Sequence, residues 1–144
     1  MADYLTQFSC MFDVGSADNA ARAEAIRCQI ADELETTEGC DLGFDMEVDA
    51  SRGPGALWIS SDGYGEPEHV IEFVLACAKT LGLSGRWGFT WALTCSKPSL
   101  DGFGGGAHLI DLGARKRLAW TDCEHWLAAV LDRATDPSEG IVFT

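Results

Sequence analysis

The sequence predicts an α+β fold: an antiparallel sheet of the ferredoxin-like, split βαβ kind (βαββαβ), extended by a C-terminal β-hairpin and a helix. Segments of alternating apolar and polar residues, typical of half-buried strands, flank two segments with helical spacing, and glycine or proline clusters separate them. The 144 residues are 47% hydrophobic, which is enough for one buried core. We therefore expect a single domain over residues 1–144, in which residues 135–144 form a tail.

Four elements are predicted in the first part of the chain. Apolar residues alternate over residues 8–14, which indicates a strand, and Ser16 is suited to cap a helix over 17–36. In "GFDMEVDA", residues 43–50, three apolar side chains alternate with three acidic ones, which predicts a half-buried strand. "ALWIS", residues 56–60, returns as the next strand after the turn "SRGPG".

A second helix and another strand follow. Pro67 suits the first turn of a helix that continues to Leu81, where Gly82 ends it. This helix is apolar on nearly all sides, so we expect it to be deeply buried. "RWGFTWALT", residues 86–94, predicts a strand with three aromatic side chains on one face. In so acidic a chain we interpret this row as core, rather than as a platform for stacking bases.

The last predicted elements are a hairpin and a helix. "AHLIDL" and "RLAWT" are expected to pair around "GARK". Thr121, followed three residues later by Glu124, matches a capping box and so marks the start of the helix. The order of elements is then β-α-β-β-α-β-β-β-α, and its first six members match the split βαβ arrangement.

The charge of the chain is concentrated in one stretch. The formal net charge is −13, and residues 28–51 hold eight acidic residues with no Lys or Arg. On the predicted strand, alternate carboxylates are about 7 Å apart, close to the ~6 to 7 Å between phosphates along one nucleic-acid strand. Such a surface repels nucleic acid and anionic membranes and attracts basic proteins. The alternative is a solvated face that only keeps the protein in solution. The eight residues are Asp32, Glu33, Glu35, Glu38, Asp41, Asp45, Glu47 and Asp49.

The stretch "TCSKPSLDGFGGGAH", residues 94–108, is the second candidate site. Its glycines permit a backbone anion nest, but the stretch joins two predicted strands and lacks the Lys and the Ser or Thr of a P-loop. A bend beside the sheet is the simpler interpretation. In the catalytic alternative, Cys95 is the nucleophile and His108 the base, with Asp101 or Asp122 orienting the imidazole.

No metal site and no cofactor are predicted. The acidic stretch lacks the glycine and the terminal glutamate of an EF-hand loop. A zinc set of Cys95, His108, Cys123 and His125 matches no common ligand spacing. His69 stands in the first turn of a predicted helix, where we expect it to face solvent.

The cysteines and the apolar segments indicate where the protein is found. The six cysteines have no CxxC spacing, which favours reduced, mostly buried thiols over a disulfide framework. No apolar segment approaches the ~20 residues of a membrane span, and the first residues lack the pattern of a signal peptide. We therefore expect a cytoplasmic protein, and the sequence indicates no oligomeric state.

Two stretches carry a resemblance to a family of proteins. "WISSDGYGEPEHVIEFV" and "WGFTWALTCSKPSLDGFGGGAHLIDL", within residues 57–112, resemble a family of small acidic proteins of bacteria and their phages for which no activity is established. The resemblance identifies no catalytic residue. It implies a link to mobile elements, whose small acidic proteins are often inhibitors of host defence nucleoproteins, including anti-CRISPR proteins.

Three functions compete on this basis. The leading hypothesis is a non-enzymatic, acidic binding module, a nucleic-acid mimic that occupies a basic nucleic-acid-binding surface of a protein or nucleoprotein. Such a module binds neither nucleic acid nor membrane itself. The alternative is a small enzyme or ligand-binding domain centred on the loop between Cys95 and His108. The third is an accessory subunit, whose contact is marked by exposed apolar residues such as Trp58.

Overall fold

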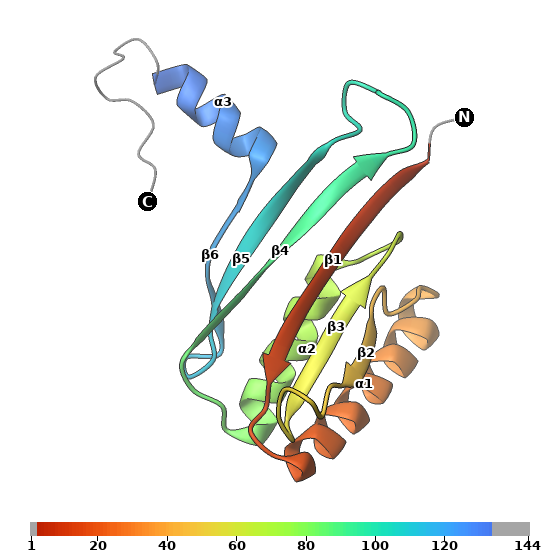
Figure 1. Ribbon diagram of the computed structural model, residues 1–144, viewed down its shortest axis with the longest axis vertical. Coiled ribbons are helices and arrows are strands. Elements are labelled where there is room, and N and C mark those ends of the chain that lie inside the picture. The colour runs from red at the N-terminus through yellow and green to blue at the C-terminus, as the bar shows by residue number, and fades with distance from the viewer. Residues whose placement is uncertain (1–2, 134–144) are drawn as a thin grey trace.

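The described part of the chain folds into a mixed α/β structure with one six-stranded antiparallel sheet and three helices (Figure 1). The structure is a computed structural model, and it describes residues 3–133; the predicted tail, 135–144, lies outside the described residues. The predicted α+β class is confirmed, and the sheet is larger than the four strands of the predicted core. The elements are β1 (Tyr4–Asp13), α1 (Ala17–Glu38), β2 (Asp45–Val48), β3 (Ala56–Ser61), α2 (Pro67–Leu81), β4 (Arg86–Cys95), β5 (Gly104–Asp111), β6 (Lys116–Asp122) and α3 (Cys123–Arg133).

Strand β1 is shared between two halves of the sheet, whose strand order is β2-β3-β1-β4-β5-β6. Its first segment, Tyr4–Gln7, pairs with Ala92–Cys95 of β4, whereas Phe8–Asp13 pair with β3. Beyond the first segment β1 and β4 separate, as Figure 1 shows. In the gap, the indole nitrogen of Trp87 donates a hydrogen bond to the carbonyl oxygen of Met11, 2.8 Å away. A side chain therefore connects the strands where their main chains no longer pair.

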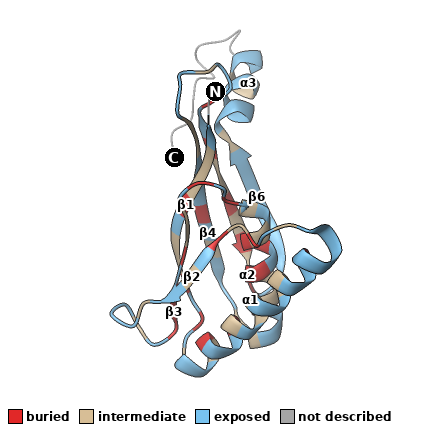
Figure 2. Cartoon of the chain, turned by 90° about the vertical axis from the view of Figure 1, so that its right-hand side faces the viewer, coloured by how far each residue is buried: buried red, intermediate tan, exposed pale blue. Residues whose placement is uncertain are grey.

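Helices α1 and α2 cover one face of the sheet, and the core lies between them and the strands (Figures 1 and 2). Aromatic rings fill much of it. The ring of Phe12 meets that of Phe73 edge-on at 6.3 Å between centroids, and Phe8 meets Phe89 in the same way at 5.9 Å. The other two aromatic side chains of the β4 row pack against this cluster. The row therefore belongs to the core, as predicted.

The ends of α1 and α2 follow the local sequence. The Ser16 hydroxyl accepts a hydrogen bond from the Asn19 amide at 3.1 Å and caps α1, as predicted. Gly39, with φ of 63°, ends this helix in the left-handed conformation that glycine adopts without strain. Pro67 begins α2 and Gly82 ends it, again as predicted.

The start of α3 differs from the prediction. The cap is Asp122, whose carboxylate accepts a hydrogen bond from the His125 amide at 2.6 Å, so the predicted capping box of Thr121 and Glu124 is wrong. Thr121 is still extended and paired with β5, which places its hydroxyl one residue too early to cap the helix. The helix therefore has a polar capping residue of the expected kind, but one position later, because β6 continues through Thr121.

Helix α3 packs against β5 and β6, at the opposite end of the molecule from α1 (Figure 1). None of its residues is buried, and Trp126, Leu127 and Leu131 remain largely exposed. Within residues 3–133, no helix has the length and apolar character that crossing a membrane requires.

Candidate functional site

Seven of the eight predicted acidic residues lie along one flank of the molecule. Four are in the last two turns of α1, one is in the loop that follows, and two are on β2, which lies beside α1 at the edge of the sheet (Figure 1). All seven are exposed, and Figure 2 views the molecule from this side. We call them the acidic flank: Asp32, Glu33, Glu35, Glu38, Asp41, Asp45 and Glu47.

No basic side chain of the described residues forms an ion pair with the acidic flank. The last turn of α1 also contains no basic residue, although the C-terminal end of a helix carries a partial negative charge. The carboxylates of this turn therefore repel the helix dipole as well as one another. The three ion pairs within residues 3–133 lie elsewhere: Glu24 with Arg27, Asp49 with Arg52, and Glu68 with Arg117.

Asp49, the eighth acidic residue, does not continue the row on β2. The strand ends at Val48, and the Asp49 carboxylate accepts hydrogen bonds from the amide and hydroxyl of Ser51 and pairs with Arg52 at 3.2 Å. These contacts, led by the Ser51 hydroxyl, hold the pKa of Asp49 below its ordinary value. The expected row of three carboxylates is a row of two, because the turn engages the third.

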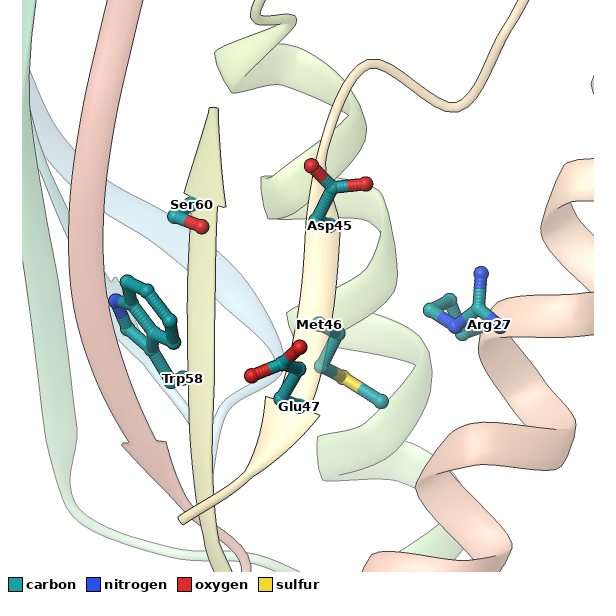
Figure 3. A pocket seen from close by; sticks show the side chains of 6 residues that line it. All are labelled: Arg27, Asp45, Met46, Glu47, Trp58 and Ser60. Carbon is teal, nitrogen blue, oxygen red and sulfur yellow. The ribbon is translucent and has the colours of Figure 1, made fainter. Parts of the chain in front are cut away.

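Asp45 and Glu47 border an open pocket of about 410 Å³ at the edge of the sheet (Figure 3). Glu47 lies opposite Trp58 of β3, and its carboxylate points toward the indole. Trp58 is 41% exposed, and its ring nitrogen donates to the Ser9 hydroxyl at 2.8 Å, which fixes the ring. An exposed indole beside carboxylates suits a Lys or Arg side chain, which can stack on the ring while it pairs with the acid.

Arg27 is the only basic side chain lining this pocket among the described residues. Its guanidinium is already paired with Glu24, one turn earlier in α1. The hydrogen bond to Glu24 and, in smaller part, the charge of Asp45 raise the pKa of Arg27 above its ordinary value. Because Glu24 holds the guanidinium, the two carboxylates on β2 remain free to pair with a cation from outside.

The glycine run of the second candidate site is part of the sheet rather than of a loop. β5 begins at Gly104, so only residues 96–103 connect it to β4, and the run pairs with β4. A Cβ at Gly106 would lie 2.7 Å from the indole of Trp91 and 2.6 Å from the carbonyl oxygen of Thr121. The glycines thus allow close packing of the strands and the indole.

The glycine run also borders an apolar groove of about 640 Å³. Trp91 and the glycines line it, together with Trp126 and Leu127 of α3. The ring nitrogen of Trp91 is buried and has no hydrogen-bond partner among residues 3–133. Neither Cys95 nor His108 lines this groove. Its chemistry is therefore that of an apolar binding surface.

The structure does not bring Cys95 and His108 together. His108 lies opposite Phe89, which precedes Cys95 by six residues of β4, so about 20 Å of extended strand separates the two side chains. The Cys95 thiol lies 3.8 Å from the Ser99 hydroxyl, and Asp101 is exposed in the connection between the strands. These residues form no pair of nucleophile and base, because the register of β4 and β5 holds them apart.

His108 is instead a buried residue of the sheet. Its ring stacks on Phe89 with 5.5 Å between the ring centroids, and its Nδ1 has no hydrogen-bond partner among the described residues. Burial, followed by the charge of Arg117, lowers the pKa of His108 below its ordinary value. The neutral imidazole is thus the form that this environment favours.

The six cysteines are all free, and they differ in burial. Cys77 is fully buried, and burial raises the pKa of its thiol to about 12. Of the others, three are partly buried, and Cys28 and Cys123 are exposed, so the expectation of mostly buried thiols is wrong, whereas the expected absence of a disulfide framework agrees with the structure. Cys28 lies on the outer side of α1, and Cys123 begins a helix that has no buried residue.

A cluster that the sequence did not predict lies where α1 ends. Glu38, Cys40 and His69 place ligating atoms within 4.8 Å of one another. His69 was expected to face solvent, but it is half-buried, and its Nδ1 is 2.9 Å from the carbonyl oxygen of Leu42. Partial desolvation, a hydrogen bond to Glu38 and nearby carboxylates hold the pKa of the Cys40 thiol above its ordinary value. No sequence motif for a metal site predicts this group, because His69 lies far from Glu38 and Cys40 along the chain.

Two surfaces of the described chain thus have the geometry of binding sites: the acidic flank beside Trp58, and the groove between the glycine run and α3. Comparisons with protein-family models, with curated proteins and with solved structures found no match to this chain.

Proposed function

We propose that this protein is a non-enzymatic, acidic binding module whose acidic flank occupies a basic surface of a partner protein or nucleoprotein. The supporting observation is the set of seven exposed carboxylates that have no ion-pair partner within residues 3–133. These carboxylates repel one another and the negative end of the α1 dipole, which raises the free energy of the unbound protein. A basic partner surface would remove this repulsion and so favour binding. Trp58 adds an apolar contact beside the charges.

We infer that the partner surface is one that binds nucleic acid. Asp45 and Glu47 are alternate residues of an extended strand, so they stand about 7 Å apart, similar to the phosphates of a nucleic-acid strand. A groove whose Lys and Arg side chains match phosphates accepts carboxylates at that spacing. The module then acts as an inhibitor by excluding the nucleic acid, as an anti-CRISPR-like mimic does.

The test is a comparison of two sets of five neutralising substitutions. In the first, five flank residues lose their charge while Glu38 and Asp41 are kept. The first step identifies proteins that the immobilised wild-type chain retains at low salt and releases at high salt. The second step measures the affinity of each such protein for the wild-type chain, for both variants and for an oligonucleotide. We expect the flank variant to bind at least about tenfold more weakly, since five exposed pairs are lost. The substitutions are Asp32→Asn, Glu33→Gln, Glu35→Gln, Asp45→Asn and Glu47→Gln.

The control set removes the same charge from exposed positions elsewhere, so that a change in net charge alone is distinguished from loss of the flank. We expect wild-type affinity from it, and we expect the wild-type chain to displace the oligonucleotide. The proposal is contradicted if both sets weaken partner binding equally, or if the chain captures a partner without displacing the oligonucleotide from it. If no partner is released by salt, the flank is only a solvated face. The control substitutions are Asp3→Asn, Asp62→Asn, Glu72→Gln, Asp101→Asn and Glu124→Gln.

A second candidate function is the binding of a small apolar ligand in the groove beneath α3. Its volume of about 640 Å³ lies within the range of ligand pockets, and Trp91 offers a buried ring nitrogen without a partner among the described residues. Anilinonaphthalene sulfonate is a suitable probe. We expect Trp126→Ala to weaken its binding and Trp58→Ala, which removes an exposed indole elsewhere, to leave it unchanged. If the two substitutions weakened probe binding equally, the groove would be excluded as the binding site of the probe.

We infer that the first six elements have the split βαβ, ferredoxin-like arrangement. The order β2-β3-β1-β4 with antiparallel neighbours supports this topology, and β5, β6 and α3 would then be an extension of it. The arrangement serves many unrelated functions, so it does not favour either surface.

A further inference from the structure

We propose that Glu38, Cys40 and His69 form a binding site for a zinc ion. Their carboxylate, thiol and imidazole groups offer three ligand atoms that lie within 4.8 Å of one another. Zn²⁺ takes sulfur, nitrogen and oxygen ligands, whereas Mg²⁺ and Ca²⁺ take oxygen alone, so this mixed set selects zinc or a similar transition metal. The proposal is independent of the partner suggested for the acidic flank.

The end of α1 places two of the ligands side by side. Glu38 is the last residue of the helix, and Gly39 turns the chain in the left-handed conformation. The turn is closed by a hydrogen bond from the Cys40 amide to the Leu34 carbonyl oxygen, 3.4 Å away. As a result, the Cys40 sulfur lies 3.6 Å from a carboxylate oxygen of Glu38.

Contacts between the following loop and α2 bring the third ligand. The Gly43 carbonyl oxygen accepts a hydrogen bond from the Glu66 amide at 3.0 Å. A Cβ at Gly43 would lie 2.5 Å from the Cβ of Glu66, so only glycine permits this approach, and its φ of 78° also favours glycine. His69, in the first turn of α2, is thereby held against the loop that carries Cys40.

The His69 ring is oriented as in many metal sites. Its Nδ1 lies 2.9 Å from the Leu42 carbonyl oxygen. A carbonyl oxygen only accepts, so Nδ1 carries the hydrogen and donates, and the lone pair of the neutral ring is on Nε2. A histidine that binds metal through one nitrogen commonly donates from the other to a carbonyl group in this way.

The surroundings provide room and negative charge. Cys40 and His69 line a cavity of about 270 Å³, together with the acidic residues Asp41 and Glu66 and the exposed Tyr64. The cavity is open to solvent, which leaves a fourth position for water. Tetrahedral zinc, with bonds of about 2.0 to 2.3 Å, places its ligands about 3.4 to 3.8 Å apart. The Cys40 sulfur and the Glu38 carboxylate already have this spacing, at 3.6 Å. The distances from these two groups to His69 do not exceed 4.8 Å, so they must shorten by at most about 1 Å when zinc binds.

Metal titration of the full chain, stripped with a chelator and then freed of it, tests the proposal. Calorimetry with Zn²⁺ is expected to give one ion per chain, and Co²⁺ is expected to give a thiolate-to-cobalt absorption band. Cys40→Ser and His69→Gln should each weaken Zn²⁺ binding by about a hundredfold or more, and Glu38→Gln by about tenfold. Cys40→Ser should also abolish the cobalt band.

Matched controls come from exposed residues of the same types. Cys28→Ser, Cys123→Ser and His125→Gln should leave the affinity and the cobalt band unchanged. Absence of one-to-one binding, or a loss with these controls as large as with Cys40→Ser, would overturn the proposal.

Thermal unfolding distinguishes loss of the site from loss of the fold. In chelator, Cys40→Ser should melt at the wild-type temperature; added Zn²⁺ should raise the melting temperature of the wild type and not that of the variant. A Zn²⁺-induced rise of equal size in both would contradict the site. The charge variant of the acidic flank keeps Glu38 and Asp41, so it should still bind Zn²⁺ whatever its effect on a partner.

Discussion

The indole nitrogen of Trp87 donates a hydrogen bond to the carbonyl oxygen of Met11, 2.8 Å away, across the gap between β4 and β1. The main chains of these strands pair only over Tyr4–Gln7 of β1. This side chain therefore joins the half of the sheet that contains β2 and β3 to the half that contains β4, β5 and β6. Other apolar side chains have no N–H group that could make this hydrogen bond.

Replacement of that indole should weaken the connection. We expect Trp87→Phe to lower the free energy of unfolding by about 1 to 3 kcal/mol, because the Met11 carbonyl group loses its partner. Denaturant unfolding measures the change. Trp120→Phe is the matched control, since Trp120 is 56% exposed, and its effect should stay within about 0.5 kcal/mol. Equal losses for both variants would show that the hydrogen bond is not the cause.

The stability of the protein should fall as the solution becomes acidic, in part because of His108. Burial lowers the pKa of this group in the folded state below its ordinary value of 6.5. Between the two pKa values the unfolded chain binds more protons than the folded chain, so the free energy of unfolding decreases as the pH falls below about 6.5. His108→Phe keeps an aromatic ring on Phe89 and removes the titration. We expect a smaller decrease for this variant; an identical pH dependence would exclude His108 as a contributor.

Substitution by alanine should change the stability of the protein differently at Gly104 and at Gly106 of β5. Gly106→Ala places a methyl group 2.7 Å from the Trp91 indole and 2.6 Å from the Thr121 carbonyl oxygen, so the strands or the ring must move. We expect a loss of about 1 to 3 kcal/mol and a changed tryptophan fluorescence. At Gly104 the nearest atom is the Leu93 Cβ at 4.0 Å, and Gly104→Ala should be neutral or slightly stabilising. Similar losses at both positions would contradict close packing at Gly106.

The cap of α3 provides a fourth test. Asp122→Ala removes the acceptor of the His125 amide, and we expect faster hydrogen exchange in the first turn of α3 and a loss of about 1 kcal/mol. Thr121→Ala, the neighbouring substitution, should leave exchange in that turn unchanged. Faster exchange with Thr121→Ala alone would favour the capping box predicted from the sequence.

Local sequence patterns predicted the start of α1 and the end of α2. Ser16 caps the first helix and Gly82 ends the second, as expected, because a helix cap depends only on a few neighbouring residues and on backbone conformation. The cap of α3 was displaced by one residue, because β6 extends as far as its pairing with β5 continues. Pairing between strands is a tertiary contact that no local pattern specifies.

The candidate sites show the same division. The acidic residues of α1 and β2 are exposed as expected, since charged side chains on amphipathic elements face water. The pair of Cys95 and His108 fails because the register of two strands, and not their nearness in sequence, sets the distance between them. The nearness of Cys40 to His69 was not predicted for the same reason, since it depends on a loop folding back onto α2.

The α+β class, most helix and strand positions, and the residues available to form an acidic surface could be predicted from the amino-acid sequence, because each follows from side-chain periodicity, backbone preference or charge. Three relationships emerge only in the folded chain: β1 pairs with strands of both halves of the sheet, the glycine run packs against an indole, and the side chains of Glu38, Cys40 and His69 lie close together. These relationships join residues far apart along the chain, and their geometry is set by strand register and loop closure, which arise from packing of the whole molecule.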